Sequence, residues 1–444
     1  MHNTIDTQIG QHMHDLVCKL FPICRSLTGD GVRQTLTILQ KEIPELTIHE
    51  VASGTPCFDW SIPDEWNITD GYILDPNGVK IVDFRQSNLH VMGYSTPINK
   101  KISLEELEKH LHSIQELPEA IPYLTSYYKR DWGFCISHSQ RQTLQPGEYQ
   151  VVIDARLGPG HMSYGEVVLP GISNQEVLIS TYVCHPSMAN NELSGPVVTS
   201  QLVRWLSSLA NREYTYRVLF IPETIGSIYY ISQHLDHLRK NVIAGFNVTC
   251  VGDDRVYSYL PSRNGKTFAD RIAQHVLKHH CEEFIHYSFL DRGSDERQYC
   301  SPGVDLPMVS IMRSKYHTYP EYHNSMDDLN LVTPEGLSGS YMALVRAILC
   351  VEHNATYTST VLCEPMLGRR NLYPSQGGRV LPEKFRYIKH ILAYSDGQHD
   401  LLSIAEIIGI PMWELLDIVE QLTSQNLISP GETEHQTAHN QTAV

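Results

Sequence analysis

The sequence predicts an α/β protein built around a mostly parallel sheet. The first observation is length, because 444 residues at roughly 150 residues per domain correspond to about three units. The second is composition: 41% hydrophobic and 19% charged residues allow a sizeable core and exclude global disorder. The third is an alternation of apolar, strand-length runs with helical segments between about residues 165 and 312.

The N-terminal part is expected to hold two helices followed by a small β domain. Within residues 1–50, leucines recur at helical spacing on both sides of a turn at Thr28–Gly31. From residue 54, short β-like runs alternate with turns that contain proline and glycine; the runs cover residues 72–74, 79–84, 90–94 and 149–153. We interpret residues 54–154 as an inserted β-rich domain.

The sheet of the main domain is predicted from alternating strands and helices. They follow one another as strand 177–183, helix 197–209, strand 216–221, helix 228–238, strand 242–251, helix 268–279 and strand 308–312. Continuous apolar strands are typical of a parallel sheet that is covered on both faces. We therefore assign residues 1–53 and 155–365 to one discontinuous α/β domain.

The tail, residues 370–432, resembles a winged helix-turn-helix. Three short helices are expected at residues 385–393, 401–408 and 412–425, followed by a strand at 426–429. DNA-binding versions carry basic side chains on the recognition helix, whereas the third helix here has three acidic residues and no Lys or Arg. The tail therefore predicts docking or dimerisation, and we expect any homo-oligomer to form through it or through the β domain.

Charge and cysteine usage restrict the partners and the compartment. Thirty-four basic against 50 acidic residues give a net charge of −16, which argues against nucleic acid or an anionic membrane as the partner. The ten cysteines form no CxxC pair, the N-terminus does not resemble a signal peptide, and no apolar run is long enough to span a membrane. We expect a cytoplasmic protein with free thiols.

Each predicted strand ends near a side chain suited to metal or acid–base chemistry. These side chains are His185, Glu223, Asp253, Asp254 and, near the last strand, Asp295, Glu296 and His323. Ligands bind beyond the carboxyl ends of the strands in an open α/β sheet, so we expect one common site. Histidine and carboxylate are the ligands of a catalytic zinc, which acidifies a water whose proton a nearby carboxylate can accept.

Further residues are candidates for substrate binding. Arg263 follows the third strand and is suited to pair with a substrate carboxylate, the alternative being a solvated surface arginine. Tyr316 and His317 are candidates for a substrate wall, with plain packing as the alternative. Glu296 either completes the metal coordination or forms a salt bridge with a neighbouring arginine.

Several motifs together carry a resemblance to a known family. They are His185 with ANNELSG (189–195), PETIGS (222–227), GSDERQY (293–299), YHNSMDDL (322–329), DWSIPDEW (59–66) and SNLHVMGYSTP (87–97). The chain resembles the zinc exopeptidases, which include aminopeptidases, glutamate carboxypeptidase and glutaminyl cyclase. It resembles most closely bacterial aminopeptidase-like proteins with an inserted β domain and a C-terminal winged helix, over nearly the whole chain.

The resemblance implies a phosphorylase/hydrolase-like α/β sandwich with a site for one or two zinc ions. By this resemblance His185 and His323 are metal ligands, and position 191 is the one that bridges two metals. Glu223 corresponds to the general base, and Asp295 to an aspartate in the proton-sharing network behind it.

The sequence departs from the family pattern at three ligand positions. Asn191 stands where the family has aspartate, Thr224 where it has a second glutamate, and Thr249 where it has an aspartate ligand. Asp253 or Asp254 is a candidate to replace the last of these. We hypothesise that Asn191 is a lesion at a metal ligand, engineered or natural, and the alternative is a site that binds one zinc or none.

The leading functional interpretation is zinc-dependent hydrolysis of an amide bond in a small peptide or amide-linked metabolite. A second interpretation is a single-zinc acyltransferase or cyclase like glutaminyl cyclase, in which an internal amine replaces water. A third is a metal-poor scaffold that binds a peptide or a sugar through the β domain.

Overall fold

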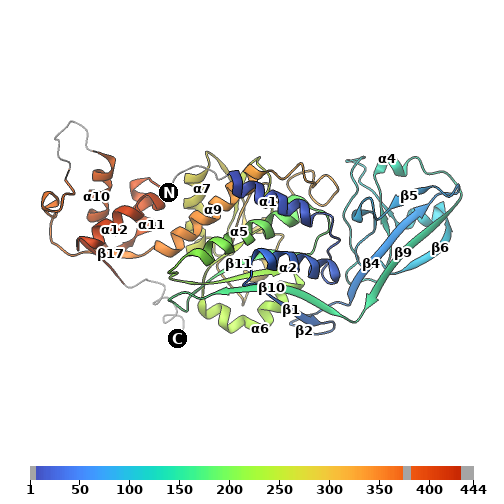
Figure 1. Cartoon of the computed structure of the whole chain (residues 1–444), viewed down its shortest axis with the longest axis horizontal. Coiled ribbons are helices and arrows are strands. Elements are labelled where there is room, and N and C mark those ends of the chain that lie inside the picture. Colours follow the sequence, from blue (N-terminus) through green and yellow to red (C-terminus); the bar gives the residue numbers. More distant parts are fainter. Residues whose placement is uncertain (1–6, 374–381, 432–444) are drawn as a thin grey trace. The chain divides into compact units, whose positions relative to one another are not determined.

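The structure is a computed structural model, and it describes residues 7–373 and 382–431. The chain divides into two compact units (Figure 1). The first unit comprises Met1–Ala269 and Phe284–Met342, and the second comprises Asp270–Glu283 and Ala343–Val444.

An eight-stranded sheet forms the centre of the first unit. Its strands, in spatial order, are β1 (Thr47–Ala52), β10 (His161–Leu169), β12 (Thr215–Ile221), β11 (Glu176–Tyr182), β13 (Val242–Asn247), β16 (Met308–Met312), β14 (Tyr257–Leu260) and β15 (Phe284–His286). The four strands from β12 to β16 are mutually parallel. Strands β1 and β10 pair antiparallel to their neighbours, and β14 pairs antiparallel to β16 and parallel to β15. The predicted α/β class with a mostly parallel core is confirmed.

Helices cover both faces of this sheet. Figure 1 shows α1 (Thr7–Leu20), α2 (Asp30–Glu42) and α5 (Ser194–Ser208) on one side and α6 (Ile225–Asn241) on the other. Side-chain alternation along β10 explains the arrangement. The ring of Tyr164 packs against Tyr230 of α6 at 6.0 Å, whereas a Cβ on the next residue, Gly165, would lie 3.1 Å from Leu36 of α2.

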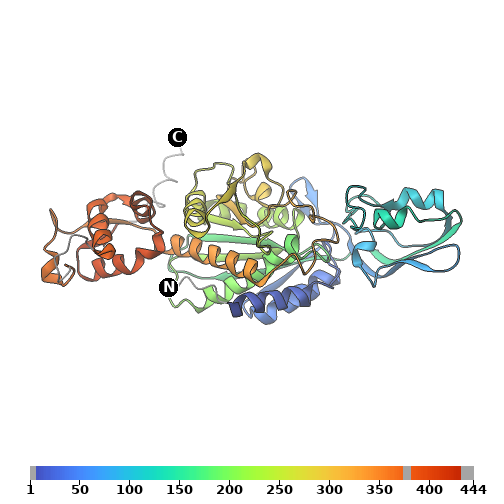
Figure 2. The same ribbon diagram turned by 90° about the horizontal axis from the view of Figure 1, so that it is seen from above.

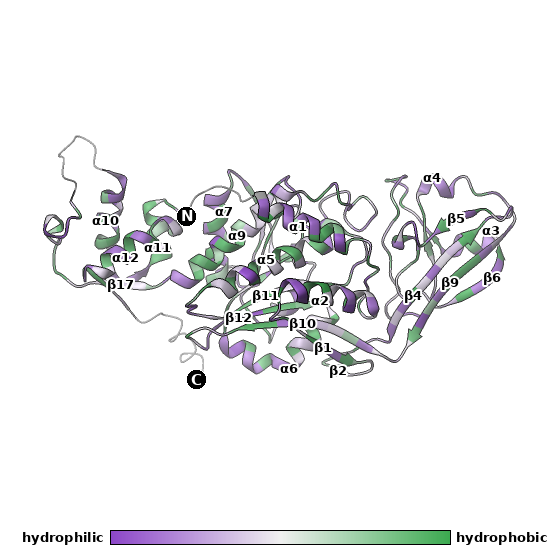
Figure 3. Cartoon of the chain, in the orientation of Figure 1, coloured by the Kyte–Doolittle hydropathy of each residue, from purple (hydrophilic) through white to green (hydrophobic). Residues whose placement is uncertain are grey.

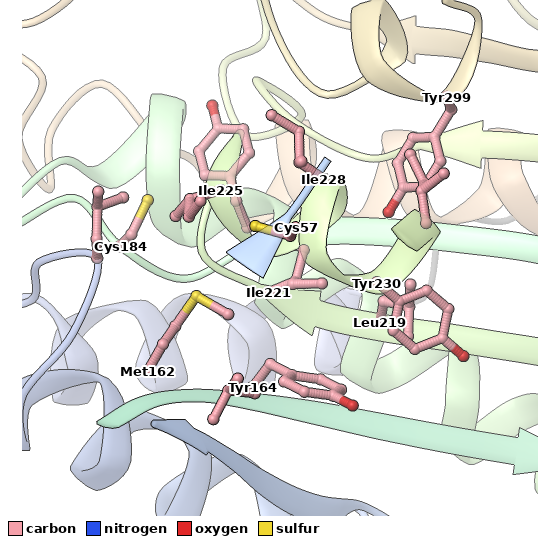
Figure 4. Close-up of a cluster of buried hydrophobic side chains, with 14 of the residues drawn as sticks. Cys57, Met162, Tyr164, Cys184, Leu219, Ile221, Ile225, Ile228, Tyr230 and Tyr299 are labelled. Atoms are coloured by element: carbon pink, nitrogen blue, oxygen red, sulfur yellow. The ribbon is translucent and has the colours of Figure 1, made fainter. Parts of the chain in front are cut away.

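The core on the α6 face joins the sheet to α6 and to the start of the inserted domain. Figure 4 shows Leu219 and Ile221 of β12 near Ile225 and Ile228 of α6, with Cys57 beside them. All seven residues of β11 are buried, as expected for a strand covered on both sides. Burial of a large apolar side chain contributes about 1.5–3 kcal/mol, so this cluster is a main source of stability.

The inserted segment forms an antiparallel sheet in the order β5 (Lys80–Asp83), β4 (Glu65–Leu74), β9 (Glu148–Gly158), β6 (Ile98–Ser103). Figure 3 shows hydrophilic and hydrophobic residues alternating along β9, which matches its alternating burial. The strand predicted at residues 90–94 is wrong. That segment starts with a short 3-10 helix, Asn88–His90, and Tyr94 adopts a left-handed conformation with φ of 65°, which ends any extended run.

Arg33 of α2 binds the inserted domain to the main sheet. Its guanidinium contacts the Glu65 carboxylate at 2.5 and 3.2 Å, and the side chain of Glu65 is only 15% exposed. Burial acts to raise the pKa of Glu65, but hydrogen bonds from Arg33, from the N–H of His161 and from Asn67 outweigh burial and lower the pKa to about 2.

This pair predicts acid-sensitive stability. A carboxyl group whose pKa is lowered by folding stabilises the protein above its unfolded pKa, and this contribution disappears as the pH falls towards the folded pKa. We expect the wild type to lose about 2 kcal/mol more unfolding free energy than Glu65→Gln between about pH 5 and pH 3, measured by urea unfolding. The exposed Glu50, 4.0 Å from Arg33, provides the control Glu50→Gln. Equal pH slopes for wild type and Glu65→Gln would contradict this prediction.

The second unit contains a three-stranded sheet in the order β18 (Asp396–Asp400), β17 (Thr356–Ser359), β19 (Ile428–Pro430). Its helices include α10 (Glu383–Tyr394), α11 (Leu401–Ile408) and α12 (Leu416–Ser424), which are among the orange and red helices of Figure 2. Asp400 caps α11 by accepting the N–H of Ser403, and Gly409 ends this helix with φ of 77°. The third predicted helix is split into a 3-10 turn, Met412–Glu414, and α12. Among the described helices, none has the length and hydropathy needed to cross a membrane.

Candidate active site

His185 lies three residues beyond the carboxyl end of β11, where the sequence predicts a ligand. It is 4% exposed, and its backbone carbonyl accepts a hydrogen bond from Nε of Arg25 at 2.9 Å. Nδ1 lies 2.9 Å from Oε2 of Glu192, so the other ring nitrogen, Nε2, faces the site. Burial, assisted by the Arg25 charge, lowers the pKa of His185 to about 3. The ring is therefore neutral at physiological pH.

Glu192 and Arg25 form a buried ion pair behind His185. Both side chains have no exposed surface, and Oε1 of Glu192 lies 3.6 Å from Nε of Arg25. Burial raises the pKa of Glu192 to about 8, while the guanidinium opposes this rise. The direct contact favours the ionised carboxylate, which accepts a hydrogen bond from Nδ1 of His185. A carboxylate behind a histidine in this way orients the ring of a metal ligand.

His323 lies in a loop and faces His185. The two ring centroids are 5.2 Å apart, and Tyr322 stacks on the His323 ring at 3.9 Å. Burial, with smaller contributions from the neighbouring His185 and His317, lowers the pKa of His323 well below its ordinary value. Nε2 of His323 is buried and has no hydrogen-bond partner among the described residues. A neutral, unpaired imidazole nitrogen at this place is a candidate metal ligand.

Glu223 follows β12 and is presented by a strained turn. Its Oε2 lies 3.8 Å from Nε2 of His185, and its side chain is 19% exposed. The next residue, Thr224, has φ of 66° and ψ of −75°, and the N–H of Ile225 donates to the Glu223 carbonyl at 2.8 Å. This is a tight γ-turn that β-branched residues avoid, at a cost of about 1–3 kcal/mol. Such strain is typical of functional sites.

Asp295 supports this turn and pairs electrostatically with Glu223. Its Oδ1 accepts the N–H of Thr224 at 2.7 Å and the hydroxyl of Ser227 at 2.8 Å, while Oδ2 is buried without a partner in the described part of the chain. Burial, followed by the Asp295 charge, raises the pKa of Glu223 to about 8, and burial raises that of Asp295 to about 6. Two carboxyl groups whose pKa values are raised in this way suit acid–base chemistry.

The remaining predicted metal positions have other contacts. Nδ2 of Asn191 donates to the Tyr182 hydroxyl at 2.7 Å, which leaves its Oδ1 buried and unpaired among the residues described. Both oxygens of Asp253 accept hydrogen bonds, from Asn190, Ser314 and the N–H of Arg255. Asp254 is exposed and contacts Thr333 at 3.5 Å. Asp253 thus supports the backbone at Arg255 and Ser314, whereas Asp254 contacts only a hydroxyl, and within the described residues neither forms a hydrogen bond or ion pair with His185 or His323.

The chain turns away before the aspartates because strand β13 is shorter than predicted. It ends at Asn247, and Cys250 takes a left-handed conformation with φ of 51°. The Asn190 side chain then accepts the N–H groups of Gly252 and Asp253. The direction of the backbone after the strand therefore places Asp253 among these hydrogen-bond partners.

Glu296 and Tyr316 form a buried hydrogen-bonded pair. The Tyr316 hydroxyl donates to Oε1 of Glu296 at 2.5 Å, and the N–H groups of Gly293 and Ser294 donate to the same oxygen. Oε2 of Glu296 accepts from Asn247 at 3.0 Å. Glu296 thus has partners on both oxygens, and neither predicted alternative, metal ligand or salt bridge to an adjacent arginine, corresponds to these contacts.

The two predicted substrate-binding residues outside this pair have different surroundings. His317 is exposed and its ring packs on Tyr322 at 4.6 Å, next to His323, so it lies at the rim of the site. Arg263 is about half exposed and pairs with Asp305. That pairing corresponds to the alternative of a surface arginine.

Sequence reasoning missed Tyr123 of the inserted domain. Its buried ring contacts both His185 and His323, each at 5.2 Å between centroids, and its N–H donates to the His323 carbonyl at 2.9 Å. The bridge Pro122–Asn324 extends this pairing. The insertion therefore holds the loop that carries His323. No local signal marks Tyr123, because it is 62 positions from His185.

Asp327 and Glu192 were also missed as functional supports, although both lie inside motifs that the sequence singled out. The Asp327 carboxylate accepts the N–H groups of Asn190 and Asn191 at 2.6 and 2.9 Å. It thereby fixes the segment that precedes α5. Burial raises the pKa of Asp327 to about 7.

In each of two groups of described residues, three possible metal-ligand atoms lie within 4.8 Å of one another. One is Cys184, His185 and Glu192, but burial raises the pKa of the Cys184 thiol well above its ordinary value and Glu192 is paired with Arg25. A protonated thiol is a poor ligand. The side of His185 that faces His323 and Glu223 is therefore the better metal site.

Comparisons with known proteins agree with this architecture. Residues 14–354 match the model of a family described as "Domain of unknown function (DUF4910)", and residues 355–430 match a winged helix-turn-helix model. A protein of Clostridium acetobutylicum named "Putative polysaccharide biosynthesis protein with aminopeptidase-like domain" is 44% identical over 401 residues, covering 90% of this chain and 92% of that protein.

Solved structures extend the comparison. A crystal structure of a "putative peptidase" from Clostridium acetobutylicum has a TM-score of 0.90 and 41% identity, covering 96% of this chain and 97% of that chain. BSAP, a zinc aminopeptidase from Bacillus subtilis, has a TM-score of 0.56 and 12% identity, covering 77% and 94%. The predicted aminopeptidase-like fold and the C-terminal winged helix are confirmed.

Proposed function

Because the chain belongs to the DUF4910 family and shares the fold of zinc aminopeptidases, we propose that it is a zinc-dependent amidohydrolase that cleaves an amide bond in a small peptide or amide-linked metabolite. One observation carries the proposal: two buried, neutral imidazoles, His185 and His323, lie with their ring centroids 5.2 Å apart, and the first is next to a carboxyl group. Nε2 of His185 lies 3.8 Å from Glu223, and Nε2 of His323 is unpaired in the described part of the molecule.

The donors present suit one zinc ion. His185 and His323 offer neutral nitrogens, and Oδ1 of Asn191 offers a buried oxygen without a partner among the described residues. Tyr182 connects the set, since its hydroxyl accepts from Asn191 and its ring lies 5.3 Å from that of His185. Three protein ligands leave one position for water or substrate. An amide oxygen is a weaker zinc ligand than a carboxylate, so we expect modest affinity.

The chain's own groups supply the proton transfers of hydrolysis. Bound zinc would acidify a water molecule and polarise the substrate carbonyl. Glu223 accepts the proton of the water as its oxygen attacks the carbonyl carbon, and returns that proton to the leaving nitrogen as the C–N bond breaks. Asp295 holds Glu223 in place through the Thr224 turn and raises its basicity. Tyr123 and Tyr322 restrict the movement of His323.

Metal content tests this assignment. We expect His185→Ala and His323→Ala to bind zinc at least tenfold more weakly than the wild type, and Asn191→Asp to bind it more tightly. Isothermal titration calorimetry of the metal-free protein with zinc measures these affinities, and elemental analysis of the zinc-loaded protein measures its metal content. His317→Ala is the matched control, because its ring is adjacent but is assigned no ligand role. Undiminished zinc affinity in both histidine variants would refute the site.

A second candidate function, intramolecular acyl transfer by a cyclase, is favoured by the one-metal donor set. In that reaction an amine of the substrate replaces water as the nucleophile. Reaction in ¹⁸O-labelled water separates the two, because only hydrolysis places solvent oxygen in the product.

The name of the Clostridium acetobutylicum relative associates that protein with polysaccharide biosynthesis. We therefore include amide-bearing sugars, together with dipeptides, in the substrate panel for this chain.

A further inference from the structure

We propose that Arg297 is an anion-binding residue of the candidate active site, and that the substrate carries a carboxylate close to the amide bond that is cleaved. The inference rests on the proposed function and specifies its substrate class. It assigns to Arg297 the role that the sequence suggested for Arg263, whose guanidinium pairs with Asp305 instead.

Arg297 reaches the site from α8 (Glu296–Tyr299), directly after Asp295. Its Nη2 donates to Oγ1 of Thr224 at 2.6 Å. Its Nε is buried and has no hydrogen-bond acceptor among residues 7–373 and 382–431. Within the same residues, no carboxylate forms an ion pair with this guanidinium. Nη1 of Arg297 is not buried and forms no hydrogen bond with a described residue, so it is the donor that a ligand from solvent can reach.

A half-buried guanidinium with open donors is unfavourable unless a ligand completes it. A buried donor without an acceptor costs about 1–3 kcal/mol. Arg presents planar, parallel N–H groups that match a carboxylate in a bidentate arrangement. Thr224 accepts one N–H of Nη2, which leaves the N–H groups of Nη1 free for such an anion.

The strained turn gives Arg297 a fixed position relative to Glu223. Thr224 is the central residue of the turn that presents Glu223, and its hydroxyl is the acceptor for Arg297. The same residue therefore sets the position of the proposed base and of the proposed anion-binding group. An anion bound at Arg297 would lie next to the carboxyl group that moves the proton.

The charge of Arg297 acts on the groups that line the rim. Burial lowers the pKa of His317, and the charges of Lys315 and Arg297 lower it further. Arg297 is therefore close enough for its charge to act on His317 at the rim of the site.

A competing explanation is that Arg297 only balances the charges of Glu223 and Asp295. Its charge does lower the pKa of both groups, against the larger effect of burial. However, a guanidinium that balances these charges is expected to form an ion pair with Glu223 or Asp295. Among the described residues, neither carboxylate forms an ion pair with Arg297. The two explanations predict different responses to substrate charge.

Two substrates that differ only in the charge of one group distinguish the two explanations. We compare hydrolysis of a dipeptide with a free carboxylate and of the same dipeptide as its carboxamide by zinc-loaded wild type, Arg297→Lys, Arg297→Gln and the control Arg292→Gln. Arg292 is exposed and lies on Phe289 in the preceding loop. We expect wild type and control to prefer the carboxylate about 10- to 100-fold in kcat/KM. Arg297→Gln should lose this preference through a raised KM, and Arg297→Lys should keep part of it.

Equal losses on both substrates in Arg297→Gln would support charge balance and overturn the inference, as would a wild type without preference. Binding gives a readout that does not require turnover. By calorimetry we expect N-acetylglycine to bind the zinc-loaded wild type at least tenfold more tightly than Arg297→Gln, and N-acetylglycinamide to bind both alike. If no amide is hydrolysed but this difference is found, the proposed function fails and the anion site stands. If hydrolysis occurs without charge preference or difference in binding, only the inference fails.

Discussion

Glu223→Gln is expected to reduce kcat by about 10²- to 10⁴-fold while the protein stays folded and keeps its zinc. Glutamine is similar in size to glutamate but cannot accept the proton of the attacking water. In the proposed site, His185, His323 and Asn191 hold the metal, so the substitution removes the base and leaves the ligands. Steady-state kinetics on the panel of small amides measures the loss, and elemental analysis measures zinc.

Glu321→Gln provides the matched control for this experiment. Glu321 lies two residues before His323, and its carboxylate pairs with Arg255. We expect the kcat of Glu321→Gln to stay within about twofold of the wild-type value, because ion pairs near the surface contribute little to stability. Loss of zinc from Glu223→Gln would show that Glu223 is a ligand and not the base. Unchanged turnover would exclude Glu223 from the chemistry.

Arg25→Met is expected to destabilise the protein by about 3–5 kcal/mol, because it leaves the Glu192 carboxylate buried without its counter-ion. Arg25 also donates to the carbonyl oxygens of His185 and Leu20. Its loss therefore loosens the segment that presents His185, and we expect weaker zinc binding together with the lower stability. Urea unfolding of the metal-free protein measures the loss of stability separately from the loss of zinc binding.

Two further variants make this measurement specific. Arg204→Met removes a guanidinium that is 45% exposed and pairs with Glu42, and we expect a loss below about 1 kcal/mol. The double variant Arg25→Met with Glu192→Gln should recover part of the loss, since it no longer buries an unpaired charge. A cost for Arg25→Met no greater than for Arg204→Met would contradict the buried ion pair.

The central part of the candidate site could be predicted because it depends on strand direction. His185 and Glu223 follow β11 and β12, and these strands are parallel neighbours, so their carboxyl ends meet at one edge of the sheet. The apolar runs that predict the strands thus also predict that the two side chains converge. Asp295 was identified from its motif, and the structure places it against the Glu223 turn.

Other contacts of the site join residues that no local pattern relates. Arg25 and His185 are 160 positions apart, and Tyr123 comes from the inserted domain. Asp253 looked like a ligand because it follows a strand, but that strand ends early and the chain turns at Cys250. Periodicity reports which face a side chain occupies within an element, and it contains no information on the direction of the chain after the element ends.

The sequence by itself determined the fold class, the winged tail and the residue types that gather at the sheet edge, since hydrophobic period and strand order depend on local patterns. Only the tertiary structure decided which of those residues are free to act. His323 and Arg297 retain open nitrogen donors or acceptors, whereas Asp253, Glu296 and Arg263 have their polar atoms engaged by neighbours distant in sequence. Whether a polar group is functional depends on which hydrogen bonds the packed chain leaves unmade, and packing is a property of the whole fold.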